Sequence, residues 1–172
     1  MDARRFLLIW GGLLVLGCGG CAGYKLGPTS GMPAGTKSIQ VNLFENKTME
    51  PRLIEYVATT LRRDLQQDGT YRLATAGDGD VVVNGVIIDF NRSELSLQPT
   101  DVLTVRDYWL SMTAQITARD RATGKIILDS KVTGRSTIRV GANLTAAEEQ
   151  AIPLMAEDLA RKATSLLVNG EW

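Results

Sequence analysis

Three basic side chains and one tryptophan are the residues of this sequence best suited to binding chemistry. Lys131, Arg135 and Arg139 alternate with other residues in the segment 125–140, and Trp109 lies in an alternating segment before it. Arginine guanidinium groups bind phosphate and carboxylate oxygens in a bidentate manner, and a tryptophan beside Arg135 would supply a cation–π pair. We therefore expect these four residues, with Arg106 nearby, to form a face that binds an anion or a partner. The alternative is an ordinary solvated sheet face.

The sequence lacks the patterns of catalytic and metal sites. It has no histidine, and its cysteines are Cys18 and Cys21, which excludes histidine-based catalysis and a disulfide framework in the body of the chain. The consecutive carboxylates Glu148-Glu149 and Glu157-Asp158 diverge on a helix surface and do not make an acid–base pair. The segment 77–80 (GDGD) predicts a tight turn, because further acidic calcium ligands are missing at the required spacing. We expect a protein without enzymatic activity, metal or cofactor.

The charge of the chain disfavours a nucleic-acid partner. The sequence carries 19 basic and 19 acidic residues. Without residues 1–17, which contain Arg4, Arg5 and Asp2, 17 basic and 18 acidic residues remain. Proteins that bind nucleic acids usually have a basic excess that neutralises phosphates.

The N-terminal segment has the composition of an export signal. Arg4 and Arg5 form a basic region, and residues 6–16 are apolar or glycine. This stretch is shorter than the roughly 20 residues that span a bilayer, and its length is typical of a signal peptide. Residues 1–17 are therefore predicted to be a signal peptide, residues 18–37 a flexible tether, and residues 38–170 a single domain.

The end of this segment, Leu14-Val15-Leu16-Gly17-Cys18, resembles the lipobox of bacterial lipoproteins. The resemblance implies that Cys18 is acylated, with Cys21 as the alternative site. An ordinary secretory signal with incidental cysteines is the other possibility. Neither Gly19 nor Ala22, the residues after the two cysteines, is the aspartate that retains lipoproteins in the inner membrane, so we expect an anchor in the outer membrane. Several acyl chains make such an anchor stable.

Hydrophobic periodicity predicts the elements of the domain. The predicted strands are Ser38–Phe44, Val81–Phe90, Asp107–Arg119 and Lys125–Val140, with Tyr71–Thr75 as a short lead-in and 91–104 as a loop. The predicted helices run from Glu50 to Asp68, with Gly69 as C-cap, and from a capping box at Thr145–Glu148 toward the C-terminus, with a kink or restart at Pro153.

The two best-defined strands are predicted to form an antiparallel hairpin. A five-residue loop would pair Ala118 with Ile126 and Trp109 with Arg135, and would keep the apolar side chains, Ile126 among them, on one face. A sheet with one apolar and one polar face is typical of antiparallel pairing. We predict an α+β fold: a two-layer sandwich of a four-stranded, mostly antiparallel or mixed sheet, with two helices on one face, in the order strand, helix, strand, strand, strand, helix.

Several segments together resemble the lipopolysaccharide-assembly lipoprotein family LptE. The segment 21–26 (CAGYKL) is similar to the start of its members, and 41–48 (VNLFENKT) to the first strand and turn. The helix segment 58–69, the strand Val81–Phe90, the opening of the strand at Asp107–Met112 and the C-terminal helix also fit. Each motif alone is weak, and their order and spacing carry the resemblance.

The resemblance implies a non-enzymatic subunit of the lipopolysaccharide translocon. Members sit inside an outer-membrane β-barrel of the LptD type, support its assembly and help deliver lipopolysaccharide to the outer leaflet. Enterobacterial members contact lipopolysaccharide through two basic residues, whose places here are taken by Asp101 and Ala146. Arg106, Arg135 and Arg139 are the nearby substitutes. Alternatively, the chain is another outer-membrane lipoprotein, similar to curli-secretion or TolB N-terminal domains, that acts as an oligomeric or scaffold subunit.

Overall fold

The computed structural model of the chain describes residues 35–98, 101–139 and 143–169, without the side chains of 96–98 and 101–106. Cys18, Cys21 and Val140 lie outside the described residues. The elements follow the order β1 (Ser38–Val41), β2 (Glu45–Asn46), α2 (Leu53–Asp68), β3 (Arg72–Leu73), β4 (Val81–Gln98), β5 (Asp101–Asp120), β6 (Ile126–Arg139) and α3 (Leu144–Asn169).

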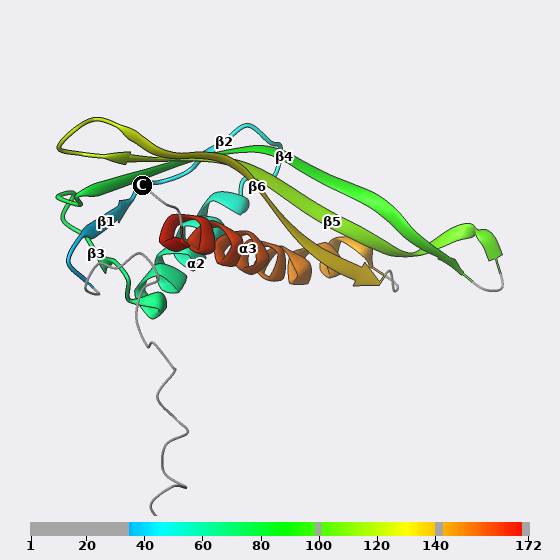
Figure 1. The fold of residues 1–172 in the computed structure, drawn as a ribbon. Helices are drawn as coiled ribbons and strands as arrows, with labels where there is room; N and C mark the ends of the chain where they lie inside the picture. Colours follow the sequence, from blue (N-terminus) through cyan, green and yellow to red (C-terminus); the bar gives the residue numbers. More distant parts are fainter. Residues whose placement is uncertain (1–34, 99–100, 140–142, 170–172) are drawn as a thin grey trace, which may run out of the picture.

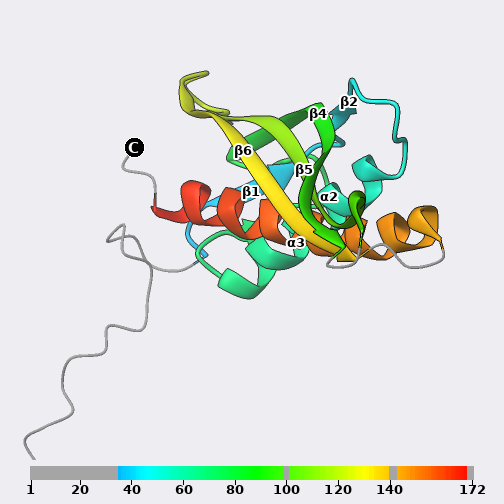
Figure 2. The same ribbon diagram turned by 90° about the vertical axis from the view of Figure 1, so that its right-hand side faces the viewer.

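The fold has two layers, a curved mixed sheet and a pair of helices that cover one of its faces (Figure 1, Figure 2). The predicted α+β sandwich is confirmed, although the sheet has six strands and not four. The additional strands are β2 and β3, each two residues long. β3 lies within the predicted short lead-in Tyr71–Thr75, whereas β2 is too short to show a periodicity of its own in the sequence.

The strand order is β3-β1-β4-β5-β6, and β2 also pairs with β4. β1 and β2 both run parallel to β4, whereas β4, β5 and β6 form an antiparallel meander. The predicted first strand, Ser38–Phe44, is thus divided, because the chain leaves the sheet after Val41 and returns at Glu45. Phe44, in between, is 2% exposed and packs in the core.

The β5–β6 hairpin has the predicted faces but a different register. Ala118 pairs with Leu128, and Trp109 pairs with Thr137 and not with Arg135. The turn between the two strands is one residue shorter than predicted, because Asp120 N–H donates a hydrogen bond to Lys125 O at 2.9 Å. A shift of one residue would turn every side chain of β6 to the opposite face.

A β-bulge beside this turn restores the apolar face. Arg119 pairs with Ile126 and Ala118 with Leu128, so β6 holds one extra residue, Ile127. Ile127 and Leu128 both pack against the core. Ile126 is 47% exposed, so its predicted inward orientation is wrong.

The predicted loop at 91–104 is wrong as well, because β4 and β5 continue through it. Their pairing runs from Val81 with Asp120 to Gln98 with Asp101. The distal part of this ribbon extends past the end of α3 (Figure 1). Neither of the described helices α2 and α3 covers this distal part, so its sequence is not constrained to bury one apolar face by which a strand is recognised.

The helices differ from the predictions mainly at their N-termini. Gly69 ends α2 with a left-handed φ of 74°, as predicted for a C-cap. In α3, Asn143 Oδ1 accepts a hydrogen bond from Ala146 N–H at 3.2 Å, so the predicted capping box at Thr145 lies inside the helix. α3 also continues through Pro153 without a restart. Neither helix of the described part combines the length and apolarity needed to cross a membrane.

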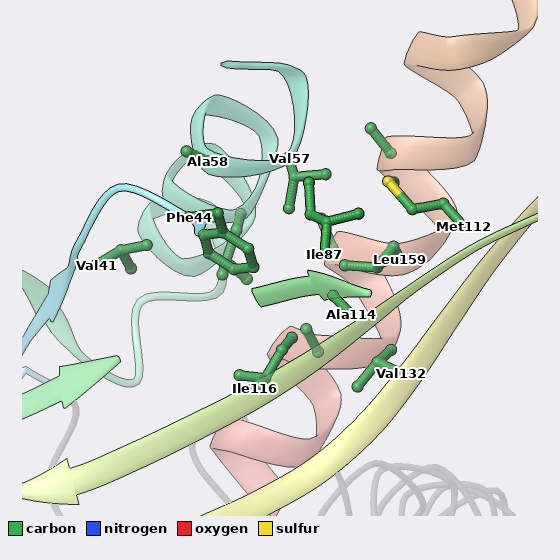
Figure 3. Close-up of a cluster of buried hydrophobic side chains, with 14 of the residues drawn as sticks. Val41, Phe44, Val57, Ala58, Ile87, Met112, Ala114, Ile116, Val132 and Leu159 are labelled. Carbon is green, nitrogen blue, oxygen red and sulfur yellow. The ribbon is translucent and has the colours of Figure 1, made fainter. Parts of the chain in front are cut away.

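The core lies between the sheet and the helices (Figure 3). Met112, Ala114 and Ile116 of β5 are fully buried, as is Leu159 of α3. A Cβ on Gly134 would lie 2.3 Å from Met155 O and 2.7 Å from Leu159 Cβ. At Gly134, α3 therefore approaches the sheet too closely to leave room for a side chain.

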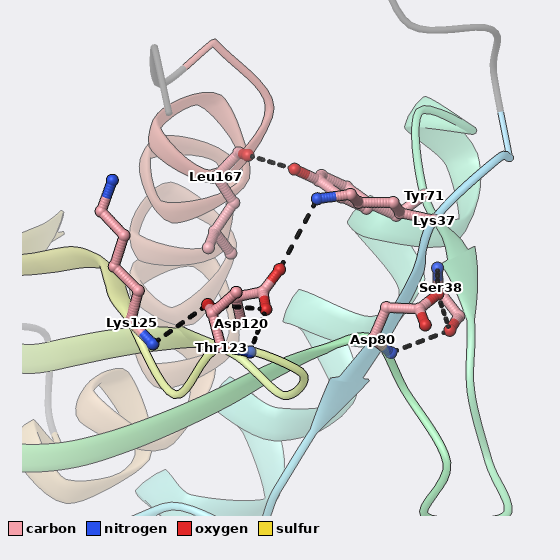
Figure 4. Close-up of polar contacts among 8 residues, drawn as sticks. All are labelled: Lys37, Ser38, Tyr71, Asp80, Asp120, Thr123, Lys125 and Leu167. Atoms are coloured by element: carbon pink, nitrogen blue, oxygen red, sulfur yellow. Dashed lines mark hydrogen bonds and ion pairs between the residues drawn. The ribbon is translucent and has the colours of Figure 1, made fainter.

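Polar contacts fix the end of the sheet at which β1 begins (Figure 4). Asp80 Oδ2 accepts hydrogen bonds from Ser38 N–H at 2.8 Å and Ser38 Oγ–H at 2.7 Å. Tyr71 Oη–H donates to Leu167 O at 3.3 Å, near the C-terminus of α3. Ser38, the first residue after the predicted tether, is thus fixed to the residue before β4, and Tyr71 links the segment before β3 to α3.

Candidate functional site

The sheet face away from α2 and α3 is the candidate site, and we name it the open face. On β5, and on β6 from Asp129 onward, it consists of the odd-numbered residues, because their even-numbered neighbours Leu110, Met112, Val132 and Ile138 are buried against the helices. Cross-strand pairing places residues from β4, β5 and β6 side by side on this face.

Hydroxyl and amide side chains form the middle of the open face. The hydroxyls of Thr113 and Thr133 are 2.9 Å apart, and Thr117 Oγ1–H and Gln115 Nε2–H both donate to Asp129 Oδ1. Farther along the sheet, Asn42 Nδ2–H donates to Asn84 Oδ1 at 2.8 Å. Such hydrogen-bonded cross-strand pairs stabilise the sheet and make this face polar.

Lys131, Arg135 and Arg139 all lie on the open face, on β6. Their cross-strand neighbours are Gln115, Ser111 and Asp107, respectively. Arg139 Nε–H donates to Asp107 Oδ1 at 3.1 Å. Within the described part of the chain, the Lys131 ammonium and the Arg135 guanidinium have no hydrogen bond or ion pair, and both residues are exposed.

Trp109 is 39% exposed on the same face. It pairs with Thr137 and not with Arg135, and the cation–π contact in the described part joins two other residues. That contact places Arg92 Cζ 5.5 Å from the ring centroid of Tyr108. Arg92 also forms an ion pair with Glu148 of α3, so this cluster lies on the helix side of the sheet. The side chain of Arg106 lies outside the described part.

The open face is mixed in charge and not uniformly cationic. Asp107 and Asp129 share it with the basic residues, and each of them accepts hydrogen bonds from its neighbours. Among the described basic side chains of this face, Arg119 donates to Gly124 O at 2.7 Å, whereas Lys131 and Arg135, on the edge strand, have no hydrogen bond or ion pair.

The outer surface of the helical layer contrasts with the open face, because most of its cations are paired. Arg52 contacts Glu50 and Glu149, and Arg63 contacts Asp64 and Glu157. Hydrogen bonding to Arg52 lowers the pKa of Glu50. A groove of about 500 Å³ between α2 and α3 is lined by Arg52, Arg63 and Glu157, together with Glu55, Tyr56 and Pro153. Both arginines of this groove are paired with carboxylates of the protein.

Asp158 and Lys162 of α3 close part of the free edge of β6, a contact that the residue pattern alone does not predict. Asp158 Oδ2 accepts a hydrogen bond from Arg135 N–H at 2.9 Å, and Lys162 Nζ donates to Thr133 O at 2.8 Å. Burial raises the pKa of Asp158, but the hydrogen bonds from Lys162 and Arg135 outweigh it and lower the pKa. The four-residue spacing of the pair was the available sequence signal, although it indicates a helical ion pair and not an edge contact.

No group of three or more histidine, cysteine, aspartate or glutamate side chains gathers within the described ranges so as to hold a metal ion. As far as the structure describes it, the open face is a broad surface of hydrogen-bonding groups that includes the exposed indole of Trp109 and the unpaired cations of Lys131 and Arg135. Its chemistry suits binding to a polar or anionic partner.

Comparisons with solved structures agree with the fold. A hypothetical protein from Chlamydia trachomatis matches with a TM-score of 0.58 at 12% identity, covering 78% of this chain and 96% of that one. A minor lipoprotein from Acinetobacter baumannii matches with a TM-score of 0.52 at 16% identity, covering 77% and 92%. A protein from Xanthomonas campestris matches with a TM-score of 0.58 at 10% identity, covering 86% and 94%. At these identities the likeness establishes the fold alone.

The sequence itself matches a family model. No curated protein is similar enough to be matched. The model described as "LptE: Lipopolysaccharide-assembly" matches residues 36–166, from the start of the sandwich almost to the end of α3. The chain therefore belongs to the LptE family of lipopolysaccharide-assembly proteins.

Proposed function

We propose that this chain is an outer-membrane lipoprotein, anchored through acylated Cys18 or, alternatively, Cys21. It binds inside or against a β-barrel of the LptD type and supports the assembly of that barrel and the transport of lipopolysaccharide to the outer leaflet. The open face contacts the barrel wall or lipopolysaccharide. The role requires binding alone and no catalysis.

One observation carries this proposal. The chain matches the LptE family over residues 36–166, and the side chains of Lys131 and Arg135 on its open face have no hydrogen bond or ion pair among the described residues. Phosphate groups of lipopolysaccharide are suitable anions for an ammonium group and a guanidinium group. The hydroxyl and amide groups beside them suit the polar interior of a barrel.

The contact is expected through side chains of the open face and not through strand addition at β6. Edge strands commonly recruit another strand through their free backbone groups. At residues 133–135 those groups are occupied by Asp158 and Lys162. The side chains of Thr133 and Arg135, in contrast, remain accessible on the open face.

Co-purification tests the choice of partner. The full-length chain with a C-terminal affinity tag is extracted from outer membranes in mild detergent. We expect a large β-barrel protein in a one-to-one complex. Recovery of a homo-oligomeric ring without a barrel would refute the proposal and favour the scaffold alternative.

Charge reversal tests the contact surface. The variant K131E/R135E should bind purified lipopolysaccharide or the barrel at least about tenfold more weakly, because two attractive contacts become repulsive. The matched control is K125E/R161E, which makes the same change in net charge at the β5–β6 turn and on α3. Equal affinities for both variants would refute the assignment of the open face.

A further inference from the structure

Trp109 occupies an unusual position on the open face. Its direct cross-strand neighbours are Ser93 on β4 and Thr137 on β6, and both are small hydroxyl residues. An indole that is 39% exposed between two short side chains projects above them and presents its ring to the surroundings. The core does not require it, because β5 supplies the core from its other face with Tyr108, Leu110 and Met112.

Two arginines flank this indole on the neighbouring strand. Arg135 and Arg139 lie two residues to either side of Thr137, so each is a diagonal neighbour of Trp109. Diagonal neighbours in antiparallel pairs are roughly 7–8 Å apart, within reach of long side chains. Arg139 is held by Asp107 at 3.1 Å, whereas the Arg135 guanidinium has no partner among the described residues. Beside Trp109, the Arg139 guanidinium is thus fixed by a carboxylate, and the Arg135 guanidinium is available to a ligand.

An exposed indole beside guanidinium and hydroxyl groups matches the chemical groups of a phosphorylated sugar. A pyranose ring has an apolar C–H face, which can pack on an aromatic ring, and hydroxyl edges, which need hydrogen-bonding partners. Ser93, Thr137 and the adjacent Ser111 supply hydroxyl groups around the indole. A guanidinium group can bind a phosphate substituent on the sugar through two parallel hydrogen bonds.

We infer that Trp109, Arg135 and Arg139 form a binding site for a phosphorylated saccharide, in which a sugar ring stacks on Trp109 and its phosphate pairs with Arg135. The inference rests on the proposed function, since lipopolysaccharide carries phosphorylated sugars. It deepens that proposal by assigning the open face to the saccharide part of the glycolipid and not to its acyl chains.

The test measures binding of deacylated lipopolysaccharide, which retains the phosphorylated sugars and lacks acyl chains. The full-length chain carries W10F and W172F, so that Trp109 is its only tryptophan. We expect saturable binding that changes the fluorescence of Trp109. Isothermal titration should show a loss of at least about tenfold in affinity for W109A, and W109F should recover most of it because the phenyl ring still stacks. The matched control is Y56A, which removes an aromatic residue that is 40% exposed on α2, and it should bind as the parent does.

Further arms separate the ligand groups. R135Q should weaken binding of the phosphorylated saccharide much more than binding of its enzymatically dephosphorylated form. Unchanged affinity of W109A, or displacement of the saccharide by inorganic phosphate at equal concentration, would overturn the inference. Binding of intact lipopolysaccharide without binding of the deacylated form would also overturn it and leave the proposed function standing. Failure of both forms to bind would remove the proposed lipopolysaccharide contact itself.

Discussion

The main-chain N–H of Arg135 donates a hydrogen bond to the carboxylate of Asp158 at 2.9 Å. A helix side chain thereby satisfies a backbone group on the free edge of the sheet. Lys162 Nζ, 2.6 Å from the same carboxylate, donates to Thr133 O. The same residue, Arg135, therefore has its backbone fixed by α3 and its guanidinium left free on the open face.

Asp158→Ala should destabilise the fold by about 1–3 kcal/mol, because it removes the acceptor of the Arg135 N–H and the carboxylate that pairs with Lys162. Urea denaturation followed by circular dichroism measures the change. The control is Glu157→Ala, which removes an exposed ion pair to Arg63 and should cost less than about 1 kcal/mol. Equal effects of the two substitutions would contradict a role for Asp158 in closing the edge.

Gly134→Ala should destabilise the protein by about 1–3 kcal/mol or more, because the added Cβ would overlap Met155 O and Leu159 Cβ. The helix would have to move away from β6 to relieve the overlap. Thermal unfolding measures the effect, with Ser136→Ala, the next residue on the helix-facing side, as the control expected to change little. A melting temperature of Gly134→Ala at or above that of the parent would show that α3 does not approach β6 as described.

Stability should fall on acidification below about pH 4. Hydrogen bonds from Ser38 lower the pKa of Asp80, and hydrogen bonds from Thr123 lower the pKa of Asp120. A carboxylate whose folded pKa lies below the unfolded value of about 3.9 stabilises the protein above that value. This stabilisation is lost as the pH falls through the folded pKa. Urea midpoints between pH 7 and pH 3 measure it.

Asp80→Asn is the matched variant for this pH dependence. It removes one titrating group, so its urea midpoint should decline less between pH 5 and pH 3 than that of the parent. A parent protein equally stable at pH 6 and pH 3 would contradict the linkage between these hydrogen bonds and stability.

Acylation at Cys18 predicts the N-terminus of the mature protein. Mass spectrometry of protein extracted from outer membranes should find diacylglyceryl and amide-linked chains on Cys18, with residues 1–17 removed. Cys18→Ala should abolish this product, and Cys21→Ala should leave it intact. The reverse pattern would assign the anchor to Cys21, and unmodified cysteines would contradict membrane anchoring by lipid.

Much of this fold could be predicted because its signals are local. The alternation on β5 and β6 identified the buried and open faces, and the helices were visible from their apolar periodicity. The register was not predictable, since it depends on a turn one residue shorter and on a bulge at Ile127 that compensates for it. The distal β4–β5 ribbon was missed because no helix lies beneath it and imposes a pattern.

The candidate site was predictable as a set of residues but not as an arrangement. Alternation placed Trp109, Lys131, Arg135 and Arg139 on one face. It could not show that Asp107 engages Arg139, while Lys131 and Arg135 have no partner in the described part. The contact between Asp158 and the edge of β6 joins residues 23 positions apart, and only the packing of α3 brings them together.

Site-specific photo-crosslinking in native outer membranes identifies the face of the protein that contacts its partner. A photoreactive amino acid replaces Thr133, in the middle of the open face, or Thr59, on the outer surface of α2. We expect the photoreactive group at position 133 to form adducts with the β-barrel or lipopolysaccharide, and the group at position 59 to form few or none. Adducts from position 59 alone would contradict the assignment of the open face as the contact surface.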